Sequence, residues 1–378
     1  FHFFVIFYGI HGEIVMLQYT KEVISLSEKR THYPTIKDVA KLANTSTATV
    51  SYILNEDASR PISQELRARV LAAVKELNYT KSAVASNLRT CKSGVVFILI
   101  PQFSNIYFTR VCEKIEDVVS SFGFLPIICD TRENPERELK LIKSAVTQRA
   151  DGIILGPTSQ GWSNTSLLRE RNIPYVIIGR ELVSEDNPAE AENTYYVGDD
   201  SYEAGFKAGR CLAENGHKHI GVIDWKANVS STLGKKQGFY DAVMANVTDG
   251  GYLETESSSV LSTEEGYRMT KTLLQRTNPT ALFYGYHRHA LGGVQYLNEI
   301  GYTVPDDISV IMVGTPSWAR ISSPKYHMIF QHEDWVGEMA GRILMKQLTK
   351  ENSSLLLKKK HICACSLVEG GSVKNLEK

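Results

Sequence analysis

The length, composition and charge of the chain exclude several classes of protein. Its 378 residues exceed one typical domain, and 43% of them are apolar, which is enough for two or three packed cores. Lys and Arg number 42, as do Asp and Glu, so the net charge is zero and the whole chain is no general polyanion binder. The six cysteines are scattered rather than spaced as a disulfide framework, which predicts a reducing, cytoplasmic location.

Residues 1–33 begin with the apolar run FHFFVIFYGI and then become mixed and polar. The run is too short to span a bilayer, and it lacks the basic segment and the small-residue cleavage site of a secretory signal. We interpret residues 1–33 as a poorly ordered leader, or as a wrongly extended reading frame with Met16 as one possible start.

Residues 35–55, TIKDVAKLANTSTATVSYILN, have the pattern of two short helices joined by a tight turn. Thr35 is a good N-cap with Asp38 three residues later, Asn44 tolerates the positive φ of the turn, and Ser46 caps the second helix. This arrangement is typical of a helix-turn-helix, although an ordinary αα-hairpin in a helical bundle is the alternative. The side chains expected on the buried faces are Ile36, Val39, Ala40, Leu42, Ala43, Val50, Ile53 and Leu54.

A third helix and a short linker follow. Ser63 is placed to cap the run QELRARVLAAVKEL, so we expect residues 34–80 to fold as one small domain. Between residues 34 and 92 there are nine Lys or Arg against five Asp or Glu, so this part has a net charge of +4 and the remainder −4. A basic end on an acidic body suits a protein that touches DNA with one end only.

These runs, together with SAVASNLRT at residues 82–90, resemble the headpiece of the lactose/galactose repressor (LacI/GalR) family of bacterial transcription regulators, and the resemblance extends more loosely to about Gly371. It implies that residues 81–92 contain a hinge helix whose Leu88 wedges between base pairs in the minor groove, with Ala85 and Arg89 beside it. A linker residue without a role is the alternative for Leu88. The expected base-edge contacts are Thr47, Ala48 and Tyr52, and the expected phosphate contacts are Thr35, Ser46, Thr49, Ser51 and Asn55.

From Gly94 apolar strands alternate with helices, which predicts parallel sheets with right-handed crossovers. The pattern occurs twice, so we predict an N-terminal all-α helix-turn-helix headpiece followed, at residues 93–378, by an α/β core of two Rossmann-like lobes, similar to periplasmic binding proteins. The expected strands are 95–100, 125–129, 152–155, 175–179, 219–223, 256–260, 280–284 and 309–313. The expected helices are 108–122, 135–149, one near Leu167, 201–215, 238–246, 264–276 and 290–300.

Ligands of open α/β sheets bind beyond the carboxyl ends of the strands, so we expect an effector site in a cleft between the lobes. Phe108 could equally be a core residue, and the alternative for Arg180 is an arginine in a surface ion pair. Lys235 stands where the family commonly has a ligand-binding arginine, and Tyr286, His287, Gly314 and Thr315 depart from its usual acidic and amide residues. The candidate effector-binding residues are Ser104, Asn105, Phe108, Arg180, Lys235, Tyr286 and His287.

Metal, cofactor and catalytic signals are weak. Two groups of possible metal ligands are present: Cys363 and Cys365 with His361, and His287 with His289. Neither group has further ligands at zinc spacing, so we expect no metal site and no cofactor. No nucleotide-binding or hydrolase motif is present, which argues against an enzyme, including a sugar-modifying one.

We therefore predict a cytoplasmic, homodimeric regulator, most simply a repressor of carbohydrate-utilisation genes, that binds a palindromic operator and a sugar or sugar phosphate. The alternative is a solute (sugar) binding protein with a non-functional headpiece.

Overall fold

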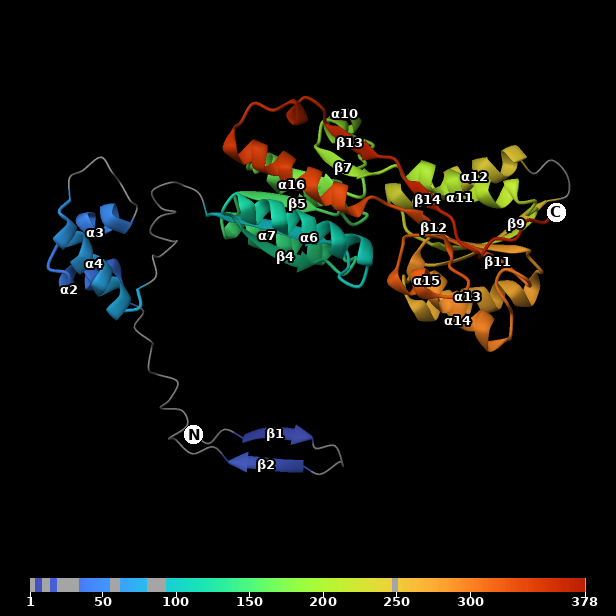
Figure 1. Ribbon diagram of the computed structural model, residues 1–378, viewed down its shortest axis with the longest axis horizontal. Helices are drawn as coiled ribbons and strands as arrows, with labels where there is room; N and C mark the ends of the chain where they lie inside the picture. Colours follow the sequence, from blue (N-terminus) through green and yellow to red (C-terminus); the bar gives the residue numbers. More distant parts are fainter. Residues whose placement is uncertain are drawn as a thin grey trace. The chain divides into compact units, whose positions relative to one another are not determined.

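The computed structural model describes residues 34–54, 62–79, 93–246 and 251–377, and the backbone alone of residues 4–8 and 14–18. It divides into two compact units, residues 1–90 and 91–378 (Figure 1). In the first, β1 (Phe4–Tyr8) pairs antiparallel with β2 (Ile14–Gln18). The sequence did not predict these two strands within residues 1–33. The leader interpretation stays a prediction for the rest of that stretch, which lies outside the described residues.

The headpiece consists of α2 (Ile36–Leu42), α3 (Thr47–Leu54) and α4 (Gln64–Glu76). Their apolar faces meet in one small core that contains Val39, Val50 and Val70, each fully buried. Because α2 and α3 are too short to be stable alone, this shared core holds them in place. The three predicted helices are confirmed. The hinge helix expected within residues 81–92 lies outside the described residues.

The first lobe of the core contains a six-stranded sheet in the order β13-β7-β6-β5-β3-β4, with every neighbouring pair parallel. Its strands are β3 (Val95–Ile100), β4 (Leu125–Asp130), β5 (Gly152–Leu155), β6 (Tyr175–Ile178), β7 (Tyr196–Asp199) and β13 (Lys360–Cys363). Its helices are α6 (Ile106–Ser121), α7 (Pro135–Thr147), α8 (Gly161–Asn164), α9 (Ser166–Glu170), α10 (Pro188–Glu192), α16 (Glu333–Thr349) and the 3-10 helix η2 (Ser354–Leu356).

The second lobe contains a sheet in the order β14-β12-β11-β10-β8-β9, parallel except for the β12–β14 pair. Its strands are β8 (His219–Trp225), β9 (Tyr252–Ser258), β10 (Ala281–Tyr284), β11 (Ser309–Val313), β12 (His327–Phe330) and β14 (Ser366–Val368). Its helices are α11 (Ser201–Glu214), α12 (Ser230–Asn246), α13 (Thr263–Arg276), α14 (His287–Glu299) and α15 (Ser317–Ile321).

The period of two along each central strand explains the layers of both lobes. In β3, Ile98 faces α6 and α16, whereas Leu99 faces α7. In β10, Phe283 faces α11 and α12, whereas Tyr284 faces α13 and α14. Each sheet is therefore covered by helices on both faces, which is why its central strands are continuous apolar runs (Figure 1).

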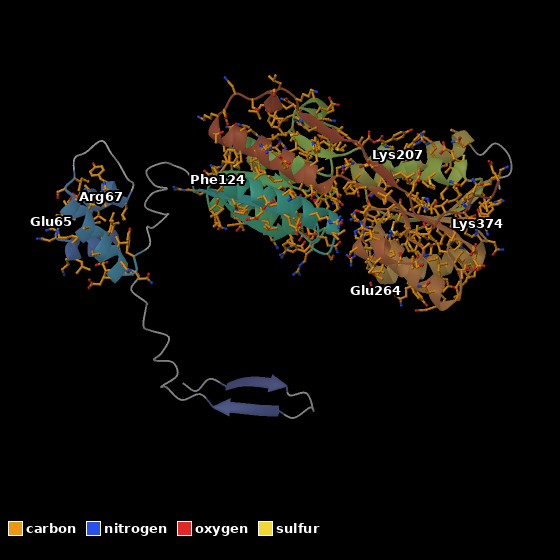
Figure 2. All side chains as sticks on the ribbon, in the orientation of Figure 1. Glu65, Arg67, Phe124, Lys207, Glu264 and Lys374 are labelled. Atoms are coloured by element: carbon orange, nitrogen blue, oxygen red, sulfur yellow. The ribbon has the colours of Figure 1, made fainter. Side chains whose placement is uncertain are left out.

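The chain crosses between the lobes three times, after β7, after β12 and after β13. His332 links all three crossings: its backbone N–H donates to Asp199 Oδ1 at 2.9 Å, and its Nε2 lies 3.1 Å from Ser366 Oγ. Lys207 of α11 donates to the Cys365 carbonyl at 2.6 Å, close to the third crossing (Figure 2). These bonds join the two lobes through a compact triple connection.

The fold class predicted from the sequence is confirmed, and two element boundaries were wrong. The helix α12 begins at Ser230 rather than at residue 238, because the Ser-Ser-Thr run forms its first turn. The strand β9 covers Tyr252–Ser258 rather than 256–260. The sequence did not place β7, β12, β13, β14 or α16. Within the described part of the chain, no helix has both the length and the apolar run that a membrane span needs.

Candidate functional site

The turn between α2 and α3 is held by its own side chains. The Asp38 carboxylate accepts from the Thr35 backbone N–H at 2.8 Å and from the Thr35 hydroxyl at 2.7 Å. Asn44 has a φ of 48°, and Ser46 Oγ accepts from the Thr49 N–H at 3.0 Å and lies 2.9 Å from Thr49 Oγ1. The capping residues and the left-handed turn residue predicted from the sequence are therefore confirmed.

The first turn of α3 is open to solvent. Thr47 and Ala48 are exposed, and Thr49, Ser51 and Tyr52 are half-buried, on the side away from Val50 and Ile53. The predicted apolar face of α2 was wrong at Leu42, which is 46% exposed because it lies about 100° round the helix axis from Ala43, off the face that Val39, Ala40 and Ala43 bury. Among the predicted DNA-binding residues, Asn55, Ala85, Leu88 and Arg89 lie outside the described residues.

Basic side chains surround this helix pair. Lys37 and Lys41 are exposed on α2, and Arg69 is exposed on α4. Arg67 of α4 is half-buried (Figure 2). The Arg69–Glu65 pair at 3.9 Å is solvent-exposed and therefore contributes little energy. The headpiece thus offers a row of hydroxyl and apolar groups on α3 and cations on its other helices, which suits contact with a polyanion that has readable edges.

A small cavity of about 40 Å³ lies between the lobes of the core. It gathers six of the seven predicted effector residues, namely Asn105, Phe108, Arg180, Lys235, Tyr286 and His287. Ser104 does not line it: its hydroxyl is exposed and accepts from Arg288 at 2.8 Å, across the two lobes. The residues that sequence reasoning missed include Tyr107, Ser231, Gln331 and Glu333.

Arg180 is buried between the lobes and fully engaged by neighbours. Its guanidinium forms two parallel bonds to Glu133, at 2.7 and 2.9 Å, and donates to the Pro157 carbonyl at 3.0 Å. Its Cζ also lies over the rings of Phe108 and Trp225, at 5.5 and 5.2 Å from their centroids. The ion-paired alternative for Arg180 is thus what the structure contains, and the guanidinium forms a wall of the cavity.

Lys235 reaches the cavity from α12, which packs tightly against α11. At Gly205 of α11 a Cβ would overlap the Lys235 carbonyl, so only glycine allows the two helices to approach this closely. The ammonium donates to the Gly285 carbonyl at 3.2 Å and lies 3.4 Å from the centroid of the Tyr286 ring. Burial lowers the pKa of Lys235 to about 7. Tyr286 is fixed in turn by its hydroxyl, 2.7 Å from Thr232 Oγ1.

Two further titratable groups line the cavity. Glu333, at the start of α16, is 2% exposed, and burial raises its pKa to about 7 although Arg110 lies 3.5 Å away. Burial lowers the pKa of His287 to about 4, so this imidazole is neutral at pH 7. Of the cationic groups around the cavity, Arg180 and Arg110 are therefore paired with carboxylates, and His287 is uncharged.

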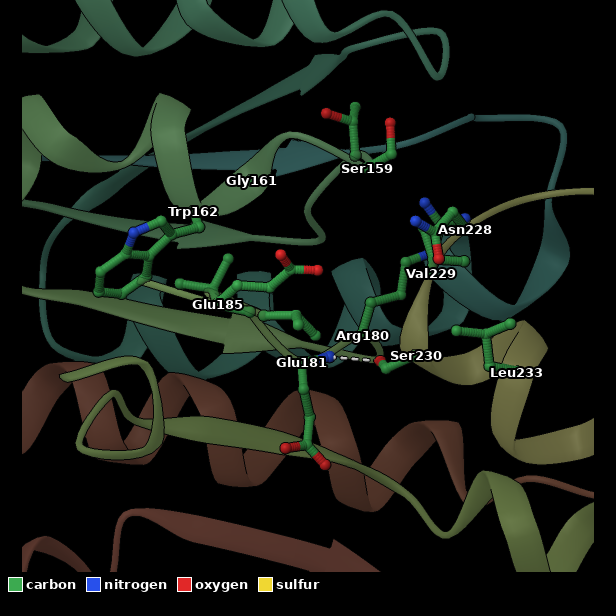
Figure 3. Close-up of a pocket in the computed structure, with 13 residues that line it drawn as sticks. Ser159, Gly161, Trp162, Arg180, Glu181, Glu185, Asn228, Val229, Ser230 and Leu233 are labelled. Atoms are coloured by element: carbon green, nitrogen blue, oxygen red, sulfur yellow. Dashed lines mark hydrogen bonds between the residues drawn. The ribbon is translucent and has the colours of Figure 1, made fainter. Parts of the chain in front are cut away.

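A larger outer pocket of about 220 Å³ adjoins this cavity, with Arg180 lining both (Figure 3). Ser159, Trp162 and Glu185 come from the first lobe, and Asn228 and Ser230 come from the second. The Ser230 hydroxyl accepts from the Glu181 N–H at 2.7 Å, which is another direct bond between the lobes (Figure 3). Polar groups beside an aromatic ring are what a small hydroxylated ligand requires.

The structure also places the residues weighed as metal ligands. Cys365 is buried, Cys363 is half-buried, and His361 Nε2 lies 3.1 Å from the Leu355 carbonyl. His289 is buried with its Nε2 3.1 Å from the Val260 carbonyl, in α14 rather than in a loop. Within the described ranges, no three His, Cys, Asp or Glu side chains come together as metal ligands.

Comparison with known proteins identifies the family. The profile described as "Bacterial regulatory proteins, lacI family" matches residues 35–82, and the profile "Periplasmic binding protein domain" matches residues 96–352. The repressor "HTH-type transcriptional repressor PurR" of Klebsiella pneumoniae is 33% identical over 322 residues, which are 84% of this chain and 91% of that protein. The chain belongs to the LacI family.

Solved structures agree with this membership. A LacI family transcriptional regulator from Silicibacter pomeroyi is 25% identical, with a TM-score of 0.76 over 90% of this chain and 99% of that one. The lac repressor dimer, bound to operator and the anti-inducer ONPF, is 20% identical with a TM-score of 0.77 over 90% and 99%, and it supports the fold.

As a member of the LacI family, the chain is a DNA-binding transcriptional repressor with an effector-binding core. Regulators of this family bind operator DNA and small-molecule effectors and form dimers. The relatives are repressors and not enzymes, which confirms the non-enzymatic function predicted from the sequence. The solute-binding alternative loses its basis, because the headpiece itself matches the regulatory family over residues 35–82.

Proposed function

We propose that this repressor acts in the cytoplasm as a homodimer, reads a palindromic operator through α3, and controls carbohydrate-utilisation genes in response to a sugar or sugar phosphate. The observation that carries the proposal is the exposed first turn of α3, held rigidly by the Ser46 cap above a buried core. One headpiece reads few bases, whereas two related by a dimer axis read a palindrome.

The proposed contacts divide into two groups. Thr47, Ala48 and Tyr52 face base edges, where a hydroxyl, a methyl and a ring contact bases without a guanine-specific arginine. The hydroxyl of Thr35 donates to Asp38, so it must turn away from that carboxylate to donate to a phosphate. The remaining proposed phosphate contacts are Ser46, Thr49, Ser51 and Asn55.

Minor-groove contact completes the proposed DNA interface. We assign it to Leu88 as the wedge, with Ala85 and Arg89 beside it, on a helix that orders when a partner and DNA support it. A wedge stabilises the bent operator only, so its loss affects specific binding more than non-specific binding.

An apolar surface at the edge of the first lobe supports the homodimer. Leu125 and Ile128 of the edge strand β4 are 60% and 37% exposed, and Phe122 at the end of α6 is 41% exposed. Such a patch on an edge strand requires a partner to keep it from water, and a second copy presents the same patch across a twofold axis.

The cavity supports the effector part of the proposal. Both lobes contribute its walls, so an occupant contacts both and biases their relative arrangement. At about 40 Å³ the cavity holds little more than a water molecule, so a sugar enters only if the lobes separate or Arg180 moves. Effector binding is therefore coupled to a change in lobe arrangement.

Selection from random-sequence DNA with the full-length protein, with and without sugars and sugar phosphates, tests the proposal. We expect a palindrome whose selection a ligand changes. Tyr52→Ala should lower affinity for that palindrome about tenfold, and Glu76→Ala, on exposed α4, should leave it unchanged. Leu88→Ala should weaken specific binding more than non-specific binding. No enrichment at low salt would contradict operator reading, and equal losses for Leu88→Ala would remove the wedge assignment.

A further inference from the structure

Three helix N-termini converge on the inter-lobe cavity. Asn105 at the start of α6, Ser231 in the first turn of α12 and His287 at the start of α14 all line it. The first N–H groups of a helix have no partner within the helix, and each N-terminus carries about half a positive charge. The cavity is therefore a favourable place for a negatively charged group.

Lys235 is the cation of this cavity that has no ion pair within the described part of the chain. Arg180 is paired with Glu133 and Arg110 with Glu333, whereas the Lys235 ammonium donates only to a backbone carbonyl. A buried ammonium without a counter-ion is costly, and an anionic ligand removes that cost.

The surroundings of Lys235 contain two carboxylates that do not fill this role. Asp224 and Asp199 attract the ammonium from beyond ion-pairing distance, and neither lines the cavity. Asp199 Oδ1 already accepts from the His332 N–H. These carboxylates favour the charged form of Lys235 and leave its position beside the cavity available to a ligand.

Tyr107 explains why Asp199 does not serve Lys235. Its side chain is buried and lines the cavity. Burial and the Asp199 carboxylate, with which the hydroxyl interacts, raise the pKa of Tyr107, so the hydroxyl keeps its proton for that carboxylate. Asp199 is therefore engaged by Tyr107 and by the His332 N–H, and Lys235 remains without a carboxylate partner.

The residues of the outer pocket indicate which chemical groups the rest of the ligand carries. Ser159 and Asn228 offer hydroxyl and amide groups (Figure 3). Trp162 adds an aromatic surface, one face of which is covered by the Arg169 guanidinium, 3.7 Å from the ring centroid. Glu185, also in the lining, is exposed and can accept from ligand hydroxyls. Such a set binds several hydroxyl groups on a ring or a short carbon chain.

We propose that the effector is a sugar acid, whose carboxylate pairs with Lys235 in the inner cavity and whose hydroxyl groups occupy the outer pocket. This inference rests on the proposed effector function and narrows its ligand. One ammonium matches the single charge of a carboxylate, and a planar carboxylate needs less room than a phosphate in a cavity of about 40 Å³.

The pH dependence of binding follows from the state of the amine. Burial keeps the pKa of Lys235 near 7; Arg180 lowers it, while Asp224, Cys365 and Asp199 raise it. Glu333, whose pKa burial raises to about 7, lines the same cavity, ionises over the same range and opposes a ligand carboxylate, whereas His287 stays neutral. Above pH 7 the free protein is increasingly neutral at Lys235, so binding a carboxylate takes up a proton. Affinity for the acid should fall about tenfold per pH unit above pH 8.

Titration calorimetry on the full-length protein tests the inference with matched probes: glucuronate against glucose, galacturonate against galactose, and gluconate against glucose 6-phosphate. We expect at least one acid to bind about tenfold or more tightly than its neutral or phosphorylated counterpart. Repeating the titration in two buffers of different ionisation enthalpy should show proton uptake by the unmodified protein near pH 8. Lys235→Arg should keep the preference with a weaker pH dependence, because only Glu333 then titrates in the cavity, and Lys235→Met should remove the preference.

Three results would overturn the inference: equal affinity for acid and neutral sugar, no binding of any acid at millimolar concentration, or an unchanged preference in Lys235→Met. Binding of the same protein sample to its selected palindrome without ligand separates this outcome from a failure of the proposed function. Operator binding that responds only to neutral sugars contradicts the sugar acid alone, and absence of operator binding contradicts the regulator proposal.

Discussion

The headpiece and the inter-lobe cavity are built in opposite ways. In the headpiece, the residues that shape the α2–α3 turn lie within fifteen positions of one another, and each holds its neighbour through a cap or a turn. In the cavity, the lining comes from Asn105 to Glu333, and each charged group is held by a residue far away in the sequence. The first site is specified locally, and the second exists only when the whole core has folded.

This difference has an energetic consequence. Caps in the headpiece each contribute about 1 kcal/mol, so a change there alters one small helix pair. A buried group in the core, such as Arg180 or Leu344, supports several segments at once, so a change there costs more. The two regions should therefore respond to substitution on different scales, which four variants can measure.

The largest effect is expected for Leu344→Asp. Leu344 of α16 is fully buried and packs against Gly152 of β5. The contact is so close that a Cβ added at Gly152 would lie 2.8 Å from Leu344 Cδ1. A carboxylate at this position should destabilise the first lobe by about 4 kcal/mol or more. Thermal unfolding followed by circular dichroism measures the loss. Leu357→Asp, at a position 84% exposed, is the matched control and should unfold as the unmodified protein does.

Arg180→Ala should cost about 3 kcal/mol, because it leaves the Glu133 carboxylate without its partner and opens the wall between the two pockets. Denaturant unfolding of Arg180→Ala, Glu133→Ala and the double variant forms a cycle. The double variant should lose less than the sum of the single variants. Additive losses would show that the pair is not coupled.

Lys235→Met should raise stability at pH 6 by roughly 2 kcal/mol, because the folded state holds this amine with a pKa near 7 instead of the usual value of about 10.4. The unfolded chain binds the proton more tightly, so the unmodified protein gains stability as the pH rises from 7 towards 10.4. The difference between the two proteins should therefore shrink across that range. A difference that stays constant with pH would contradict the assignment.

The smallest effect is expected for Ser46→Ala. The loss of the cap on α3 should cost the headpiece about 1 kcal/mol, and Ser46→Asp should restore most of it. Hydrogen exchange of the α3 amides in the full-length protein measures this local change. The same exchange in α16 should not differ between the three proteins. Loss of protection in both regions would contradict the separation of the two sites.

The headpiece was largely predictable, since its signals are local. Residue type alone predicts the turn at Asn44 and the helix caps at Ser46 and Ser63. Leu42 was the exception: an apolar residue was counted as buried, although its angular position lies outside the face formed by Val39, Ala40 and Ala43.

The cavity was predictable only in part. Their positions at the ends of strands allowed Arg180 and Tyr286 to be predicted as lining residues. Nothing near Arg180 in the sequence indicates that Glu133 pairs with it. Glu333 and Gln331 follow β12, whose place in the second sheet depends on three crossings that periodicity cannot order. Sequence reasoning therefore found the residues that line the cavity better than it found their charge states, which depend on burial and on distant partners.

The triple connection between the lobes sets the order in which a growing chain can fold. The core of the first lobe includes Val336, Ala340 and Leu344 of α16, and its sheet is completed by β13 at residues 360–363. During synthesis, β3 to β7 therefore leave the ribosome first and remain without α16 and β13 until the whole second lobe has been translated. Their apolar α16-facing side stays uncovered for more than a hundred residues of translation. Although the first lobe is encoded first, its exposed apolar side is where we expect chaperones to bind the nascent repressor.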